Sequence, residues 1–300
     1  MSFFLNYQGS KWTESKHLAE LDFSSYENII EPFGGSFGFS RYLYEKLKLT
    51  DKKYFIYDNN KELIDFYNYI KKRIVEDTID NFLSVHNSIA EDLIERFKTG
   101  KDKSQVNLKD TEKYIKENIS EEGGMKYIRF MLLHNLKSNH ISRIYIKKRI
   151  NKGFLQLMKK AEFIFQPFDN LDLRGYDKDK SLIYLDPPYI LEDNSYYKSV
   201  DETFSYYEKL VNLFKTNICL FVHSYNGLLD YVFKDYTFMT YDKTYRNKGN
   251  KKIHSVYYNP ETPKIEENRI IYEKIIKEIK ETGEIKPSII KLIRETEFWF

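Results

Sequence analysis

Residues 28–38 read NIIEPFGGSFG, a short apolar run that leads into a turn with three glycines. The apolar periodicity of residues 39–49 predicts a helix after this turn. Residues 53–57 predict a second short strand, which ends at Asp58, and residues 59–74 predict a second helix with one apolar face. Strands and helices that alternate in this way are typical of a doubly wound α/β sheet.

The strand pattern is then interrupted by a long polar region. Residues 71–155 are helix-prone, and the stretch 126–160 holds ten Lys or Arg residues and no Asp or Glu. We therefore predict a Rossmann-like sheet domain formed by residues 1–70 and 156–262, with an inserted, mainly helical domain at 71–155. The remaining residues, 263–300, predict a helical C-terminal extension.

Strands are predicted again after the inserted region. Each is a short apolar run bounded by polar or turn-forming residues, and these runs lie at residues 162–165, 181–185, 217–222, 237–241 and 253–258. Residues 204–214 predict a helix between the second and third of them. The last two read as a terminal strand pair joined by a basic loop.

Composition limits the class of protein. The 300 residues are 41% hydrophobic and 31% charged, as in a globular chain, and the net charge is only +3. A nucleic-acid signal must therefore lie in the local distribution of charge. The single cysteine, Cys219, excludes a disulfide within the chain, gives no support for a metal site, and is expected in the core. No apolar run approaches the roughly 20 residues of a membrane span, so we expect a soluble, cytoplasmic protein.

Residues 185–189 read LDPPY directly after an apolar run. Two consecutive prolines cannot continue a strand, because they lack N–H groups and fix φ, so Asp186 is expected at the carboxyl end. Ligands bind at that edge of open α/β sheets. A carboxylate, the free carbonyls of the prolines and the face of Tyr189 suit a planar group with an amino substituent, such as a nucleobase. The alternative is a strand followed by a proline-rich turn.

The glycine turn and Asp58 suggest a nucleoside site. The spacing of Gly34, Gly35 and Gly38 does not fit the dinucleotide pattern, and the turn lacks the Lys of a phosphate-binding loop, so that a ligand without phosphate fits better. The turn alone is also compatible with a purely structural role. An acidic residue at the position of Asp58 can bind ribose hydroxyls, or it can cap the following helix.

Two further polar groups complete this set. Asp169 follows the strand at residues 162–165, and Lys11 lies on a turn of small residues near the N-terminus. Lys11 could pair with a carboxylate, although a single lysine is more often a solvated surface residue.

Together these segments resemble the Dam-like (D12 class) adenine-specific DNA methyltransferases over most of residues 5–260. The resemblance rests on five motifs that occur in the order of the family: YQGSK at 7–11, EPFGGS at 31–36, DNN at 58–60, FD at 168–169 and DPPY at 186–189. It implies a methyltransferase sheet in which the inserted region is the DNA-recognition domain.

The resemblance implies S-adenosyl-L-methionine as cofactor. Tyr7 and Lys11 would lie near its methionine end, and Asp58 would hold the ribose hydroxyls. Phe168 and Asp169 would bracket the adenine ring. The full set of expected cofactor-binding residues is Tyr7, Lys11, Phe33, Gly34, Gly35, Ser36, Asp58, Phe168, Asp169 and Asp186.

By the same resemblance, Asp186 and the Pro187 carbonyl would accept hydrogen bonds from the amino group of the target adenine, and Tyr189 would stack on the flipped base. This amino nitrogen is a poor nucleophile, because its lone pair is delocalised into the ring. Two acceptors can hold it in a pyramidal geometry and stabilise the charge that develops during transfer, without a covalent enzyme intermediate. Flipping costs a few kcal/mol, which pocket contacts offset.

Double-stranded DNA is the expected partner. Lysines and arginines of the inserted region would contact phosphates and make binding salt-dependent, and side chains such as Arg143 or Asn139 could read base edges. The alternative for this region is a solvated helix face. The expected DNA-binding residues are Lys137, Asn139, Arg143, Lys147, Lys148, Arg149, Arg246 and Lys248. We expect a monomer or weak dimer, and whether a cognate restriction endonuclease accompanies it stays open.

Two departures from the family pattern qualify these expectations. Relatives that methylate GATC carry a Phe-Asn-Gly stretch in the recognition region, where residues 136–143 here read LKSNHISR. The target sequence is therefore not assigned. Relatives also tend to have a Glu early in the last strand, where this chain has His254 and Ser255.

Three other functions fit the sequence less well than methylation of adenine in DNA. Methylation of RNA or of a protein glutamine more often uses Asn at the position of Asp186. A nucleic-acid-binding protein that has lost catalysis is opposed by the presence of Asp186, Tyr189 and Asp58. A nicotinamide oxidoreductase is disfavoured by the glycine spacing.

Overall fold

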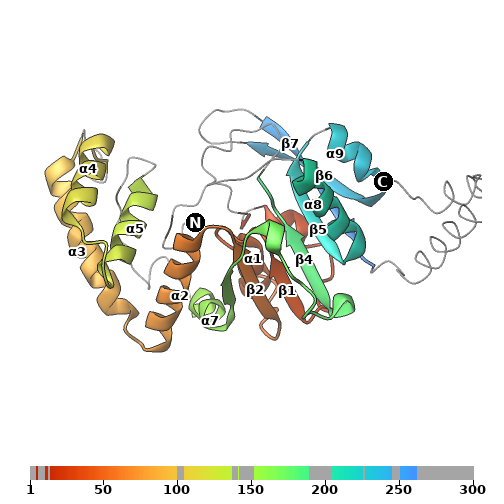
Figure 1. Ribbon diagram of the computed structural model, residues 1–300, viewed down its shortest axis with the longest axis horizontal. Coiled ribbons are helices and arrows are strands. Elements are labelled where there is room, and N and C mark those ends of the chain that lie inside the picture. Colours follow the sequence, from red (N-terminus) through yellow and green to blue (C-terminus); the bar gives the residue numbers. More distant parts are fainter. Residues whose placement is uncertain are drawn as a thin grey trace, which may run out of the picture.

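A seven-stranded sheet forms the centre of the molecule, with strand order β3-β2-β1-β4-β5-β7-β6 (Figure 1). The computed structural model describes residues 5, 11–12, 14–99, 105–136, 141, 152–188, 204–225, 227–244 and 251–261. The strands are β1 (Asn28–Glu31), β2 (Lys53–Asp58), β3 (Glu162–Phe165), β4 (Ser181–Leu185), β5 (Cys219–Ser224), β6 (Thr237–Thr244) and β7 (Lys251–Asn259).

The direction of the strands divides the sheet into two parts. Strands β1 to β5 pair in parallel, whereas β7 is antiparallel to both β5 and β6. The predicted ranges 162–165 and 181–185 agree with β3 and β4, and the predicted terminal pair is confirmed, although β6 and β7 are longer than predicted. The α/β sheet expected from the sequence is therefore present.

Successive side chains of the central strands are buried on opposite faces of this sheet. In β4, Leu182 packs into one hydrophobic cluster and Ile183 into the other, and both are at most 2% exposed. In β5, Leu220 and Phe221 divide between the clusters in the same way, and the single cysteine, Cys219, is 0% exposed as expected. Strands buried on both faces read as continuous apolar runs, which explains why they were visible in the sequence.

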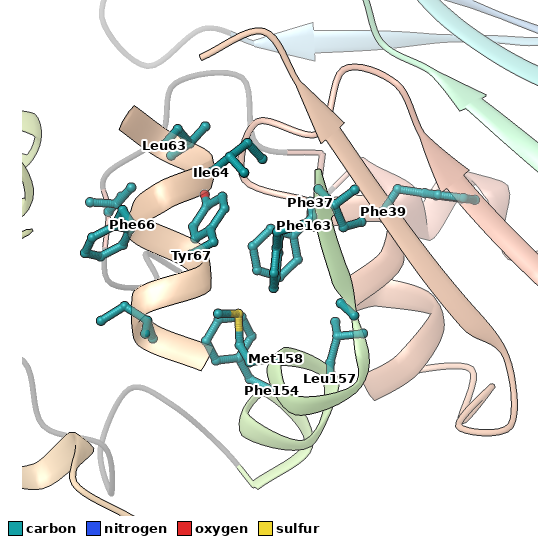
Figure 2. Packing of buried hydrophobic residues seen from close by; sticks show 14 of the residues in the cluster. Phe37, Phe39, Leu63, Ile64, Phe66, Tyr67, Phe154, Leu157, Met158 and Phe163 are labelled. Atoms are coloured by element: carbon teal, nitrogen blue, oxygen red, sulfur yellow. The ribbon is translucent and has the colours of Figure 1, made fainter. Parts of the chain in front are cut away.

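Helices cover both faces. On one side lie α1 (Gly38–Glu45), α2 (Lys61–Val75) and α7 (Lys152–Lys160), and on the other lie α8 (Phe204–Thr216) and α9 (Gly227–Val232) (Figure 1). Figure 2 shows how aromatic side chains join the first group, with Phe37 beside Phe154, Phe163 and Tyr67. The Phe37 and Phe154 rings stack with their centroids 5.8 Å apart.

Two helix ends differ from the predicted ones. The helix predicted at 39–49 ends at Glu45, because Lys48 adopts a left-handed conformation with φ of 60°. Leu47 and Leu49 still pack against the core, which extended the apolar pattern beyond the helix. The helix predicted at 59–74 begins at Lys61, and the Asn60 side chain caps it by accepting from the Leu63 N–H.

The described residues between α2 and α7 include the helices α3 (Ile79–Phe97), α4 (Leu108–Asn118) and α5 (Met125–Leu136), which extend beyond α2 away from the sheet (Figure 1). Tyr127 of α5 stacks on Tyr69 of α2 with ring centroids 4.1 Å apart. The predicted limits at residues 70 and 155 fall inside α2 and α7, so the described helices continue across them. The division into domains stays a prediction, and residues 263–300 lie outside the described ranges.

Candidate active site

The candidate site lies where the direction of chain progression reverses in the sheet. The chain runs from β1 outward to β2 and β3, and then returns to β4, which pairs with the other side of β1. Because these strands are parallel, their carboxyl ends share one edge, and ligands of open α/β sheets bind there. Glu31, Asp58 and Asp186 are at the ends of β1, β2 and β4, so three carboxyl groups occur at this edge.

The glycine turn after β1 is packed tightly against β2. The Gly34 N–H donates to the Tyr57 carbonyl at 2.7 Å. A Cβ at position 34 would overlap the Ile56 side chain and lie 2.9 Å from the Tyr57 oxygen. Gly35 has a φ of 47°, in the left-handed region that favours glycine. The close approach of β2 therefore excludes a side chain at position 34.

Asp58 fastens this turn to the start of α2. One carboxylate oxygen accepts from the Gly35 N–H at 2.9 Å, and the other accepts from the Asn60 N–H at 2.8 Å. Burial raises the pKa of Asp58, and these two hydrogen bonds oppose the shift. The alternative role of Asp58 as the helix cap is wrong, because Asn60 is the N-cap residue of α2.

Lys11 and Asp186 form an ion pair at this edge. The Lys11 Nζ lies 2.7 Å from the Asp186 Oδ1, and the two side chains are 6% and 17% exposed. Burial disfavours the charge of Lys11, but Asp186 and Glu14 outweigh it and raise the pKa of Lys11. Burial raises the pKa of Asp186, and the Lys11 ammonium acts in the opposite direction. Lys11 is therefore a buried partner of the candidate catalytic carboxylate and not a solvated surface lysine.

Glu31 is a site residue that the sequence reasoning did not single out. It is 3% exposed, and it accepts from the Ser40 N–H in the first turn of α1 at 2.7 Å. Burial raises the pKa of Glu31 to about 8, the hydrogen bond to Ser40 opposes the shift, and Asp186 adds to it. Its position at the end of a strand, like those of Asp58 and Asp186, was the signal that could have identified it.

Aromatic side chains form a second part of the edge. The rings of Phe33 and Phe168 have centroids 4.8 Å apart, and Tyr206 of α8 packs against both. Phe168 is in the 3-10 helix η2 (Phe168–Asn170), where it is buried while the neighbouring Asp169 is exposed. The structure thus brings together two expected cofactor-binding residues, Phe33 after β1 and Phe168 after β3, and it adds Tyr206.

The other expected site residues divide into two groups. Ser36 and Pro187 are buried within the described structure. The second group lies outside the described residues: Tyr7, Tyr189, Lys137, Asn139, Arg143, Lys147, Lys148, Arg149, Arg246 and Lys248.

No group of three or more His, Cys, Asp or Glu side chains in the described ranges is arranged to hold a metal ion. Likewise, no described helix is long and apolar enough to cross a membrane.

Comparison with known proteins agrees with the geometry of the site. No curated protein matches this chain significantly. The family model for D12 class N6 adenine-specific DNA methyltransferases matches residues 7–285, which include the glycine turn, Asp58 and the Asp186 motif. The match extends over most of the sequence, and the sheet has the expected doubly wound form. The chain therefore belongs to the D12 class of N6 adenine-specific DNA methyltransferases.

Proposed function

We propose that this chain transfers the methyl group of S-adenosyl-L-methionine to the exocyclic amino nitrogen of an adenine flipped out of duplex DNA. The observation that carries the proposal is the buried ion pair of Lys11 with Asp186 at the carboxyl end of β4. An ionised carboxylate at this position can accept a hydrogen bond from an amino group, which a protonated one does poorly.

The residues of the edge fit this cofactor. Residues 31–38 contain no Lys or Arg to bind a phosphate. Asp58 uses one lone pair of each oxygen for a backbone N–H, so that further lone pairs are available to hydroxyl groups. Phe33 and Phe168 offer apolar surface for a ring, with the exposed Asp169 beside them. The cofactor supplies an activated methyl group on a sulfonium, and Tyr7, Lys11, Gly34, Gly35 and Ser36 are the further residues proposed to hold it.

The target side of the mechanism rests on two acceptors. The Asp186 carboxylate, whose ionised form the Lys11 ammonium stabilises, accepts one hydrogen bond from the amino group, and the Pro187 carbonyl accepts the other. Together they orient the nitrogen lone pair and stabilise the positive charge that develops on it. Tyr189 stacks on the base. A flipped base held by its exocyclic amino group agrees with the N6 adenine specificity of the family.

DNA contacts are proposed for the region between α2 and α7 and for the loop between β6 and β7. We propose that residues 71–155 form a target-recognition domain, in which Lys137, Lys147, Lys148 and Arg149 bind phosphates and Asn139 and Arg143 read bases. Arg246 and Lys248 would contact the strand near the flipped base. Support comes from the absence of acidic residues over 126–160.

Asp186→Ala and Asp186→Asn test the catalytic part of this proposal. We expect kcat for methyl transfer to duplex DNA to fall by at least about 100-fold in both, because an acceptor that stabilises the transition state is lost. DNA binding should change little. Transfer of a labelled methyl group and an equilibrium binding assay measure the two quantities.

Asp172→Ala is the matched control for this experiment. Asp172 is exposed and pairs with Arg174 on the surface, so its replacement should leave kcat unchanged. Transfer by Asp186→Ala at the rate of this control would contradict the proposed role of Asp186.

A further inference from the structure

Glu14 lies at the centre of a buried polar cluster beside the Lys11–Asp186 pair. It is the residue before the 3-10 helix η1 (Ser15–Leu18). Its Oε1 lies 2.6 Å from the Nζ of Lys243, and its Oε2 accepts a hydrogen bond from the Tyr241 hydroxyl at 2.7 Å. The side chains of Glu14 and Lys243 are only 12% and 16% exposed. The N-terminal segment that carries Lys11 is thereby tied to β6.

The side chains of β6 and β7 that surround Glu14 lie on one face of this strand pair. Tyr241 and Lys243 are two residues apart in β6, so their side chains point to the same side of the sheet. His254 of β7 is directly opposite Tyr241, and its Nδ1 is 3.8 Å from the Glu14 Oε2. Burial and Lys243 lower the pKa of His254 to about 3, although Glu14 opposes them, so that His254 is neutral near pH 7. His17 stacks on Tyr241 with ring centroids 4.7 Å apart.

The charged members of the cluster balance one another. Lys11 and Lys243 supply two positive charges, and Asp186 and Glu14 supply two negative ones. Burial favours the neutral form of Glu14, but Lys11 and Lys243 outweigh it and lower its pKa. Burial and Lys11 lower the pKa of Lys243, and Glu14 opposes that shift. Each carboxylate therefore stabilises ammonium groups whose charged form burial disfavours.

We propose that Glu14 is a positioning residue for methyl transfer, which holds the Lys11 ammonium against Asp186 and fixes β6 to this pair through Lys243 and Tyr241. The inference rests on the proposed role of Asp186. Without the Glu14 charge, two buried ammonium groups would share one carboxylate. A neutral Lys11 would no longer hold the Asp186 carboxylate in the orientation that accepts from the amino group.

The electrostatic surroundings of the pair come from several elements. The titratable and charged groups that interact with Lys11 or Asp186 are Glu14 before η1, Glu31 of β1, Tyr184 of β4, Lys243 of β6 and His254 of β7. Around them, Tyr241 of β6 donates to Glu14, and His223 of β5 acts on His254. Of these, Glu14 and Lys243 are an ion pair whose two members can be replaced one at a time, with opposite effects on Lys11.

The test compares the pH dependence of kcat in Glu14→Gln and Lys243→Gln. In Glu14→Gln the loss of a negative charge lowers the pKa of the ammonium groups, so the alkaline limb of the profile moves down by about one pH unit. At a pH on the alkaline limb itself, this shift lowers kcat by up to about tenfold relative to wild type, with little change in KM. In Lys243→Gln the loss of a positive charge raises the pKa of Lys11, and the alkaline limb moves to higher pH.

Glu14→Asp and Glu20→Gln are the controls. The aspartate keeps the charge and should restore the position of the alkaline limb with part of kcat, whereas Glu20 is exposed and its replacement should change neither quantity. A merely structural role would not move the two limbs in opposite directions. The inference is overturned if the profiles of Glu14→Gln and Lys243→Gln coincide with that of Glu20→Gln or shift in the same direction. An active Asp186→Ala in the same series would instead overturn the proposed function.

Discussion

In the Lys11–Asp186 pair, burial and a neighbouring charge have opposite effects on the protonation of one carboxylate. A buried carboxylate tends to bind a proton, and the ammonium at 2.7 Å opposes this. The sequence revealed both residues, because each is part of a recognisable motif, but it did not reveal that they meet. Their contact depends on how the N-terminal segment crosses the sheet, a non-local feature that no periodicity encodes. Glu14 was missed for the same reason.

Gly34 offers a direct test of the glycine turn. We predict that Gly34→Ala destabilises the protein by about 1–3 kcal/mol, because its Cβ would meet the Ile56 side chain and the Tyr57 carbonyl. The displaced turn should also weaken binding of S-adenosyl-L-methionine. Gly175→Ala is the control, since a Cβ there meets no atom within 4 Å. Urea unfolding and calorimetric titration measure both effects, and equal stability of the two variants would contradict the packing described for the turn.

Glu31 gives a prediction about pH. Its folded pKa of about 8 exceeds the ordinary value of 4.5, so the folded state binds the extra proton between these values. The contribution of Glu31 to stability is then complete below about pH 4.5 and is lost as the pH rises through about 8. Glu31→Gln mimics the protonated acid and removes this dependence.

The stability of Glu31→Gln relative to wild type should therefore increase from pH 5 to pH 8. The slope is at most about 1.4 kcal/mol for each pH unit. Urea unfolding at several pH values, without cofactor, measures the difference. A difference that stays constant over this window would show that Glu31 does not carry a raised pKa.

At the scale of elements, the strands were easier to predict than the ends of the helices. Strands β3 and β4 are short apolar runs with polar or proline residues at their ends, and the sequence placed them correctly. The end of α1 was misplaced because Leu47 and Leu49 continue the apolar pattern while the backbone has already left the helix. The start of α2 is capped by the Asn60 side chain, which accepts from the Leu63 N–H, whereas the sequence suggested only Asp58 as a cap.

The cap of α2 can be tested against a cap elsewhere. Asn60 and Asn107 each accept a backbone N–H at the start of a helix, α2 and α4 respectively. Replacing either by alanine should cost about 1 kcal/mol of stability. Only Asn60→Ala should also weaken binding of S-adenosyl-L-methionine, because loss of the cap loosens the start of α2 and displaces the backbone N–H of residue 60 that donates to Asp58. Unfolding and cofactor titration of both variants measure this, and equal cofactor affinity would argue against a role of Asp58 in binding.

At the scale of the whole molecule, charge is distributed unevenly although the net value is only +3. The sheet edge carries the buried carboxyl groups, and the region 126–160 carries an excess of lysine and arginine. The sequence indicated the family and the separation of the basic region from the carboxyl groups. It did not establish the division into domains or the DNA sequence that is recognised. Recognition of a particular DNA sequence depends on side-chain directions that local patterns do not specify.

The basic region predicts a salt effect on DNA binding. Replacing Lys147, Lys148 and Arg149 by glutamine should weaken binding and reduce the slope of log K against log salt by up to about 3, one for each lost phosphate contact. The control replaces Arg174, Lys178 and Lys180, which are exposed and lie in the segment between β3 and β4. Binding isotherms at several salt concentrations measure the slope, and an unchanged slope would place the phosphate contacts elsewhere.

Adenine methylation that depends on Asp186 is the central claim, and sequencing that detects modified bases tests it most directly. DNA would be taken from cells that lack other adenine methyltransferases and that express either the wild-type chain or Asp186→Ala at matched levels. We predict N6-methyladenine at one recurring sequence with the wild-type chain and none above background with the variant. The claim would be contradicted by unmodified adenines in the wild-type sample, or by equal methylation in both samples.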